Sequence, residues 1–387
     1  MIGCPYFTVN KKKKTESLAE IPIRNGASSL IPQHTMEAEF TKNLMTWNDS
    51  QNKRSMPWKG EKDPYRIWLS EVILQQTRVE QGLSYYNKFI HAFPTVKNLA
   101  DAPEQEVFKL WEGLGYYTRC KNLHATAKII VGQYQGTFPN SYQEIVSLKG
   151  IGPYTAAAIA SFAFNLPFAV VDGNVQRVIS RYFGINTPID SVQGKKLYLE
   201  IAESLLDKEN PALYNQAIMD FGATICKPQN PLCTQCIQNK ECQAYQHNWV
   251  DRLPVKEKSI KKKERWFTYY VVRYKKQVYI RKRSEKDIWA NLYEFILKES
   301  NGKYEQQDAA QYPTIQSLTG ITNFKIKSIS PYYKQQLTHQ TIHGQFIIIT
   351  VNSPLPDLSY QLVPESELSR FPFPKLINSF LAEIKMP

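Results

Sequence analysis

Long apolar runs are missing from this sequence, and no stretch approaches the roughly 18 residues that a membrane-spanning helix needs. The N-terminus also lacks the form of a signal peptide, because Lys11–Lys14 are followed by polar residues instead of an apolar stretch. Internal repeats are absent as well. We therefore expect a cytoplasmic chain, whose six cysteines are reduced or bound to metal rather than paired in disulfides.

Acidic residues are scarce relative to basic ones. Asp and Glu together number 35, Lys and Arg number 48, and the formal net charge is +13. This excess favours a polyanionic partner, with nucleic acid first and an anionic membrane surface second. The alternative, on charge alone, is a protein that is simply soluble and basic.

The length of 387 residues exceeds one ordinary domain and predicts two or three. Apolar residues make up 42% of the chain, which is enough to form packed cores. Changes in pattern divide the chain into a disordered basic tail or upstream extension, a helical domain, a charged linker and an α+β domain. We place these segments at residues 1–35, 36–250, 251–265 and 266–387.

Apolar residues recur at helical spacing in the second segment and at a spacing of two in the last. We expect about ten short helices in the former, with periodic runs at 119–132, 153–165, 174–183, 191–206 and 211–225. In the latter we expect strands at 266–273, 278–283, 292–298, 324–329 and 345–352, and helices near 306–318 and from 373.

Four cysteines lie close together in the spacing C-x6-C-x2-C-x5-C: Cys226, Cys233, Cys236 and Cys242. Four thiolates at such short range can share one metal centre. A zinc ribbon usually has two C-x2-C pairs, whereas Cys233 and Cys236 form the single pair here. The pattern therefore favours a [4Fe–4S] cluster, with zinc or unrelated structural cysteines as the alternatives.

A glycine hairpin is present at Leu148–Ile159, where Gly150 and Gly152 let the backbone turn sharply. Pro153 then begins an alanine-rich helix, whose exposed amide groups would hold a DNA phosphate without reading a base. Lys149 adds positive charge. The alternative is an ordinary helix–turn–helix corner.

Two carboxyl groups stand out. Glu71 shares a partly apolar helix face, so burial would raise its pKa and make it a candidate general acid. Asp172 follows an apolar stretch and precedes a glycine at the expected start of a helix. The simpler interpretations are a surface glutamate and an N-cap aspartate.

In combination these motifs resemble the helix-hairpin-helix DNA glycosylases of the endonuclease III type. Within them the chain is similar to the adenine DNA glycosylases of the MutY kind. The resemblance covers residues 36–250 and includes Glu71–Thr77, Gly113–Tyr117 and Asn215–Ala217. It implies a DNA repair enzyme that removes adenine mispaired with 8-oxoguanine or guanine in duplex DNA. Such an enzyme would act as a monomer on nucleoid DNA.

The resemblance also implies catalytic roles. Glu71 would protonate the extruded adenine, and Asp172 would stabilise the positively charged sugar, so that one carboxyl is neutral and the other charged. Tyr154 and Asn174 would position both groups. Endonuclease III has a lysine at the position of Tyr154 that attacks the sugar, and its absence implies a monofunctional glycosylase.

Further contacts follow from the same resemblance. The adenine pocket would be lined by Arg54, Met56, Trp58, Val79 and Gln216. The duplex and the base opposite the adenine would be contacted by Gln76, Thr77, Leu114 and Tyr116.

The last segment resembles the Nudix-like domain that reads 8-oxoguanine in this family. The family's Phe-Ser-His loop corresponds to Leu337-Thr338-His339, which lacks the aromatic residue. No Nudix box is present, so pyrophosphate hydrolysis is not expected. Two other functions compete with the adenine glycosylase: a pyrimidine-specific or bifunctional glycosylase/lyase, and a silent DNA-binding protein.

Overall fold

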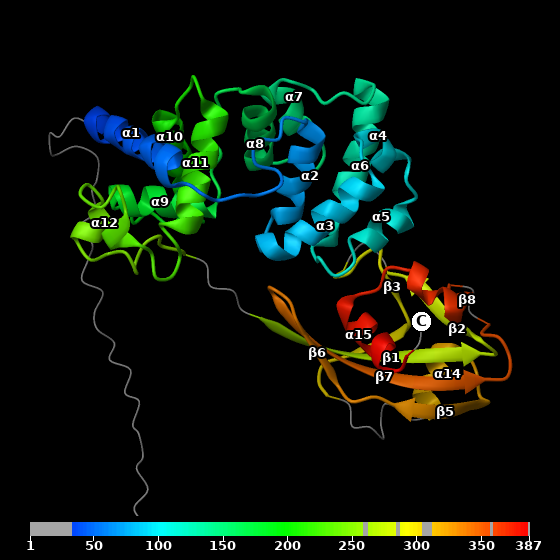
Figure 1. Ribbon diagram of the computed structural model, residues 1–387. Coiled ribbons are helices and arrows are strands. Elements are labelled where there is room, and N and C mark those ends of the chain that lie inside the picture. Colours follow the sequence, from blue (N-terminus) through cyan, green and yellow to red (C-terminus); the bar gives the residue numbers. More distant parts are fainter. Residues whose placement is uncertain (1–32, 258–261, 284–286, 304–311, 357–358, 386–387) are drawn as a thin grey trace, which may run out of the picture.

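The computed structural model describes residues 33–257, 262–283, 287–303, 312–356 and 359–385 (Figure 1). The expected basic tail at 1–35 lies outside these residues, except that its last three already belong to a helix. Among the described residues, no helix is long and apolar enough to cross a membrane.

The first part of the described chain is all helical, as the sequence predicts. Its helices are α1 (Gln33–Gln51), α2 (Pro64–Leu74), α3 (Val79–Ala92), α4 (Val96–Asp101), α5 (Glu104–Leu110), α6 (Tyr117–Tyr134), α7 (Tyr142–Ser147), α8 (Pro153–Phe164), α9 (Gly173–Phe183), α10 (Val192–Leu205), α11 (Pro211–Thr224), η1 (Cys233–Gln235) and α12 (Gln243–Gln246). Their starts follow local capping chemistry. Asp63 accepts a hydrogen bond from the Tyr65 amide ahead of α2, and Thr95 forms a capping box with Asn98 at α4.

These helices form two lobes with separate cores. One core lies among the consecutive helices α2 to α8. The other is formed by four helices: α1, α9, α10 and α11. Trp47 of α1 packs edge-on against Phe221 of α11, so the first helix completes the lobe made by the last ones. Figure 1 shows the two lobes side by side, with α8 and α11 at their junction. The cleft between them is where functional side chains from distant segments meet.

The second part is a mixed sheet with helices on both faces. Its elements are β1 (Lys263–Tyr274), β2 (Gln277–Lys282), β3 (Tyr293–Glu294), β4 (Ile296–Ser300), α14 (Tyr312–Thr319), β5 (Phe324–Ile329), β6 (Tyr333–Gln336), β7 (Gln340–Val351), β8 (Gln361–Pro364), η2 (Glu365–Arg370) and α15 (Lys375–Glu383). The main strand order is β3-β2-β1-β7-β5, with β1 and β7 parallel. The strands β4, β6 and β8 pair with β1, β7 and β2 respectively.

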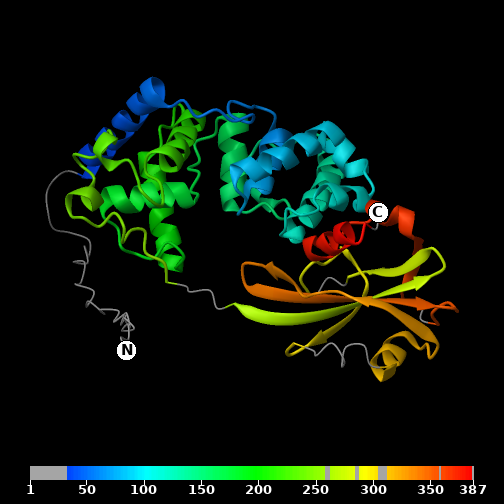
Figure 2. The same cartoon turned by 60° about the horizontal axis from the view of Figure 1, so that its bottom comes forward.

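The two faces of this sheet bury different side chains. Phe346 stacks on Phe380 of α15 on one face, and Ile347 packs with Ile315 of α14 on the other. This alternation follows from the period of two along β7. Figure 2 shows α15 on the side of the sheet that faces the helical part.

Several boundaries differ from the sequence predictions. Residues 251–257 do not form a free linker, because Leu253 is buried and the Val255 carbonyl accepts a hydrogen bond from the Ile189 amide. The first strand, β1, begins earlier than expected, at Lys263 within the predicted linker, and the run 292–298 is divided between β3 and β4. The short strands β6 and β8 were not predicted, since their few residues carry no clear apolar alternation. The expected helix at 306–318 is described only from Tyr312 onward.

The tight turn before α10 leads to a stability prediction. A Cβ atom added at Gly194 would lie 1.9 Å from the Pro188 carbonyl oxygen, so Gly194→Ala forces the helix away from that turn. We expect the free energy of unfolding to fall by about 1–3 kcal/mol. The control is Gly132→Ala in α6, where the new Cβ meets nothing within 4 Å. That change should raise stability by up to about 1 kcal/mol. Denaturant unfolding followed by circular dichroism measures both, and equal effects would contradict the steric explanation.

Candidate active site

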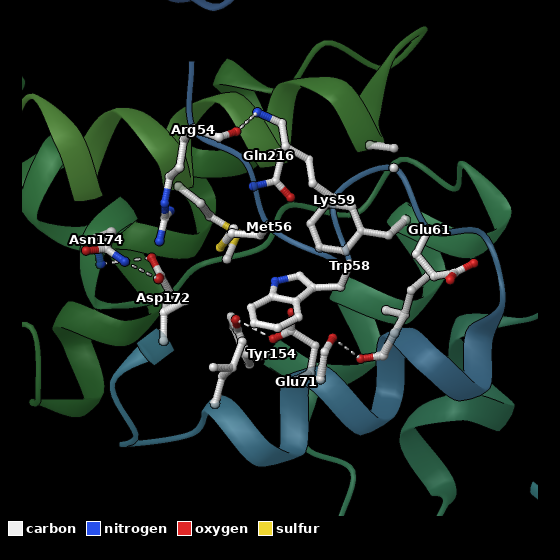
Figure 3. A pocket seen from close by; sticks show the side chains of 18 of the residues that line it. Arg54, Met56, Trp58, Lys59, Glu61, Glu71, Tyr154, Asp172, Asn174 and Gln216 are labelled. Atoms are coloured by element: carbon white, nitrogen blue, oxygen red, sulfur yellow. Dashed lines mark hydrogen bonds between the residues drawn. The ribbon is translucent and has the colours of Figure 1, made fainter. Parts of the chain in front are cut away.

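A cavity of about 660 Å³ lies in the cleft between the two helical lobes (Figure 3). Its walls come from the segment before α2, from α2 itself, from the starts of α8 and α9, and from α11. Glu71 and Asp172 both line it, although 101 positions separate them in the chain. Figure 3 shows Glu71 and Tyr154 on one wall and Asp172 with Asn174 on another.

Glu71 is the more deeply buried of the two carboxyl residues. It is 7% exposed, because α2 is packed on nearly all sides. The Tyr154 hydroxyl donates a hydrogen bond to its Oε2 at 2.6 Å. Burial, opposed by that hydrogen bond and reinforced by the nearby Asp172 charge, raises the pKa of Glu71 to about 7. The residue therefore meets the proton requirement of a general acid near neutral pH.

Asp172 occupies the N-cap of α9 and is far better supplied with donors. Its Oδ1 accepts hydrogen bonds from the backbone amides of Asn174 and Val175 at 2.8 Å each, and its Oδ2 accepts one from Asn174 Nδ2 at 2.6 Å. Burial nevertheless raises its pKa, and these three hydrogen bonds oppose that rise. The start of the helix thus does not by itself lower the pKa of Asp172. What distinguishes Asp172 from Glu71 is the number of hydrogen bonds that favour the charged carboxylate, which is three for Asp172 and one for Glu71.

The predicted adenine-pocket residues all line this cavity: Arg54, Met56, Trp58, Val79 and Gln216. Sequence reasoning missed the residue that holds two of them. Asp220 is fully buried and accepts hydrogen bonds from Arg54 at 2.8 Å and from Gln216 at 2.9 Å. Its other oxygen accepts hydrogen bonds from Lys59 at 2.9 Å and from Asn52 at 3.0 Å. A carboxylate on an apolar helix face was the signal, as it was for Glu71.

The glycine hairpin joins α7 to α8, so the predicted helix–hairpin–helix is present. Gly150 has a φ of +77°, and a Cβ there would lie 2.6 Å from the Asn122 side chain. Gly152 is the N-cap of α8, and Lys149 is exposed beside it. The Lys149 carbonyl accepts a hydrogen bond from Thr126 at 2.5 Å, which ties the hairpin to α6. The outer side of the hairpin is therefore exposed, with the amides at the start of α8 beside it.

The residues expected to contact the duplex lie at two loops. Gln76 and Thr77 follow α2, and Gln76 is exposed with a φ of +58°. Tyr116 is 41% exposed, whereas Leu114 is only 6% exposed and packs in the core. The Leu114 side chain is therefore largely covered in this structure, and its contact with the duplex stays a prediction.

Arg119 joins these two loops and was also missed. Its guanidinium donates hydrogen bonds to the carbonyls of Val72 at 2.6 Å and Gln75 at 2.7 Å, and it lies 5.2 Å from the Tyr116 ring centre. The end of the helix that holds Glu71 is thereby connected to Tyr116.

The predicted 8-oxoguanine residues form the turn between β6 and β7. Leu337 is partly buried, whereas Thr338 and His339 are exposed. The Thr338 and Tyr116 hydroxyls share a hydrogen bond of 2.5 Å across the two domains. Both residues line a second cavity of about 610 Å³ between the helical part and the sheet. The structure thus brings Leu114 and Tyr116 together with residues 337–339, whereas Gln76 and Thr77 line the first cavity.

The four clustered cysteines line one small cavity of about 30 Å³ beside Arg181. Burial raises the pKa of Cys233, Cys236 and Cys242. Within the described ranges, no three His, Cys, Asp or Glu side chains are placed to hold a metal ion. Cysteines arranged around a cavity, rather than around a point, fit a multi-atom cluster better than a single ion.

The chain matches two families of known proteins. Residues 69–203 match the HhH-GPD superfamily of base excision DNA repair proteins, and residues 268–383 match the NUDIX domain. An adenine DNA glycosylase of Buchnera aphidicola subsp. Baizongia pistaciae is 37% identical over 321 residues, which are 81% of this chain and 86% of that protein. The chain belongs to the adenine DNA glycosylase family.

Other relatives agree with this membership. The human adenine DNA glycosylase is 40% identical over 216 residues, covering 54% of this chain and 39% of that protein. The structure of a thermostable thymine-DNA glycosylase covers 55% of this chain and 98% of its own, with 30% identity and a TM-score of 0.51. The protein is therefore a DNA repair enzyme with a helix-hairpin-helix glycosylase domain and a C-terminal Nudix-like domain.

The raised pKa of Glu71 leads to a prediction on pH dependence. If Glu71 acts as the acid, base release is greatest where Glu71 is protonated and Asp172 is ionised, and it falls as the pH rises through about 7, where Glu71 loses its proton. Tyr154→Phe removes a hydrogen bond that favours the charged form, so the falling limb should move to higher pH. Tyr142→Phe, outside the cavity, is the control. Single-turnover rates across pH measure this, and an unmoved limb in Tyr154→Phe would contradict the assignment.

Proposed function

We propose that the enzyme removes adenine opposite 8-oxoguanine, or opposite guanine, by hydrolysis and without cutting the strand. The observation that carries this proposal is the pair of carboxyl groups across one cavity in a member of the adenine DNA glycosylase family. Glu71 has a pKa of about 7 and accepts one hydrogen bond. Asp172 accepts three hydrogen bonds, two of them at the start of α9.

The proposed reaction begins with extrusion of adenine into the cavity, because its bond to the sugar is inaccessible in the stacked duplex. Glu71 protonates the adenine ring, so the bond from C1′ to the base breaks and its electron pair leaves with the base. The Asp172 carboxylate stabilises the cationic sugar. Water then adds to C1′, and its proton passes to the Glu71 carboxylate, which restores the acid.

The proposal that the enzyme removes the base without cutting the strand rests on the surroundings of the amines near the cavity. The position where a lyase needs a nucleophilic lysine is Tyr154, whose hydroxyl is bound to Glu71. Among the described lining residues, Lys59 is paired with buried Asp220 and Lys62 donates to the Phe162 carbonyl. Both amines are thus already held by other partners within the protein.

Recognition of the opposite base is assigned to the second cavity. Tyr116 from the helical domain and Thr338 from the Nudix-like domain approach it from opposite sides. A hydroxyl accepts or donates hydrogen bonds, so Thr338 is suited to the altered edge of 8-oxoguanine. Gln76 and Thr77 approach the duplex from the end of α2, and His339 is exposed beside Thr338.

We further propose that Cys226, Cys233, Cys236 and Cys242 hold a [4Fe–4S] cluster. They line a common cavity, and Arg181 places a positive charge 3.5 Å from the Cys226 sulfur. When bound, the cluster supplies a rigid cross-link for the loop after α11, and no reaction step requires it. The partner is double-stranded DNA, on which we propose that the enzyme acts as a monomer in the cytoplasm, associated with the nucleoid.

An activity assay on defined mispairs tests the reaction. We expect free adenine from a duplex with adenine opposite 8-oxoguanine, and strand cleavage only after alkali is added. Glu71→Gln should reduce base release by at least about a hundredfold, in line with loss of a general acid. Its duplex affinity should remain close to that of the unchanged protein.

Two outcomes would contradict this assignment. Direct strand cleavage without adenine release would instead favour a pyrimidine-specific or bifunctional glycosylase. Loss of duplex binding in Glu71→Gln would indicate a structural role for that side chain.

The cluster has its own test. Protein purified without oxygen should be brown and contain about four irons per chain. Cys233→Ser should lose the colour. Cys120→Ser should retain it, because Cys120 lies outside the cluster loop, buried where α6 packs on α5. Stoichiometric zinc in place of iron would overturn the proposal.

A further inference from the structure

The short segment before α15 docks directly on the helical domain through Glu112. The Phe373 amide donates a hydrogen bond to Glu112 Oε1 at 2.7 Å, and Lys109 Nζ donates to Glu112 Oε2 at 2.9 Å. The same Lys109 amine donates to the Phe371 carbonyl at 3.1 Å. One glutamate and one lysine therefore clamp the Nudix-like domain from both sides of Pro372.

Glu112 also stands at the base of the loop that carries Tyr116. Its backbone carbonyl accepts a hydrogen bond from Tyr85 at 2.7 Å, and the next amide, that of Gly113, donates to the Tyr117 hydroxyl at 3.1 Å. Trp111 closes the loop by donating to the Gly115 carbonyl at 3.0 Å. A shift of Glu112 is therefore passed to a loop that has little freedom of its own.

On the other side, the clamp continues to the recognition turn. Phe373 leads into α15, where the Leu376 amide donates a hydrogen bond to Gln335 Oε1 at 2.9 Å. Gln335 belongs to β6, which runs directly into the turn with Thr338. Thr338 in turn meets Tyr116 at 2.5 Å. The contacts thus connect Glu112 to four residues that line the second cavity, namely Leu376, Gln335, Thr338 and Tyr116.

Other contacts between the domains are weaker candidates for this role. Lys282 pairs with Glu104 at 2.5 Å, but both side chains are more than two-fifths exposed. Exposed pairs contribute little, because water and salt screen them. The Glu112 and Lys109 side chains are 18% and 31% exposed, and the carboxylate also binds a backbone amide. Hydrogen bonds to charged groups in such surroundings are the stronger kind.

We propose that Glu112 is a positioning residue for the choice of opposite base. By holding Phe373, it sets the spacing between Tyr116 and Thr338, and with it the preference for 8-oxoguanine over guanine. This inference rests on the proposed function of the second cavity. Adenine hydrolysis itself takes place in the other cavity, so we expect loss of the clamp to change the rate on an adenine–guanine mispair less than the rate on an adenine–8-oxoguanine mispair.

The test compares full-length Glu112→Ala and Glu112→Gln with the unchanged protein, on duplexes with adenine opposite 8-oxoguanine and opposite guanine. Loss of a charge-assisted hydrogen bond predicts about a tenfold fall in the ratio of the two kcat/KM values for Glu112→Ala. Glu112→Gln keeps an acceptor for the Phe373 amide and should lose about threefold or less. Rates on the guanine mispair should stay within about twofold for both variants.

The matched control is Asp101→Asn, which removes an exposed helical ion pair with Lys97 and should leave the ratio unchanged. Lys109→Gln provides an independent arm, and it should lower the ratio as Glu112→Ala does. If Glu112→Ala does not fold, Lys109→Gln and Glu112→Gln decide the question. Equal losses on both duplexes, or an unchanged ratio, would overturn the inference.

Different results would contradict the role of the second cavity and the positioning role of Glu112. If the unchanged protein shows no preference for 8-oxoguanine, the proposed role of the second cavity is wrong. If that preference is present and survives in Glu112→Ala and Lys109→Gln, the positioning role alone is wrong.

Discussion

Burial of two carboxyl groups against one shared cavity is the constraint on which the rest of the structure depends. Each group is costly to bury as an anion, and the Asp172 charge further raises the pKa of Glu71. The fold distinguishes the two carboxyl groups by supplying three hydrogen-bond donors to Asp172 and one to Glu71. Placing them on different lobes makes this possible, because a helix start serves one side and a packed helix interior serves the other.

A second buried anion organises the opposite wall of the same cavity. Asp220 gathers Arg54, Lys59 and Gln216 from two segments, and all its partners are donors. The cysteine loop is joined to the site through Arg177, which donates to the Cys226 carbonyl at 2.7 Å and to Asn174 Oδ1 at 2.8 Å. Asn174 in turn donates to Asp172, so three successive hydrogen bonds connect Cys226 to the Asp172 carboxylate.

Local patterns were sufficient to predict the hairpin, the helix starts and the grouping of the four cysteines, because each depends on residues close in sequence. Burial of Glu71 followed from the apolar face of α2. Asp220, Arg119 and Glu112 were missed, since their roles arise from partners that are 40 to 260 residues away. The strand β6 was missed because its side chains are polar and its pairing with β7 supplies the stability.

The place of α1 has a consequence for synthesis of the chain on the ribosome. Phe40 and Trp47 are buried against Tyr182 and Phe221, which emerge more than 130 residues later. The lobe that holds Asp172 is therefore discontinuous in the chain, with α2 to α8 inserted between its parts. Its first helix must wait with an uncovered apolar face while the inserted lobe is made and folds. Nascent-chain chaperones would meet this enzyme at its first helix, long before either carboxyl group has a cavity to line.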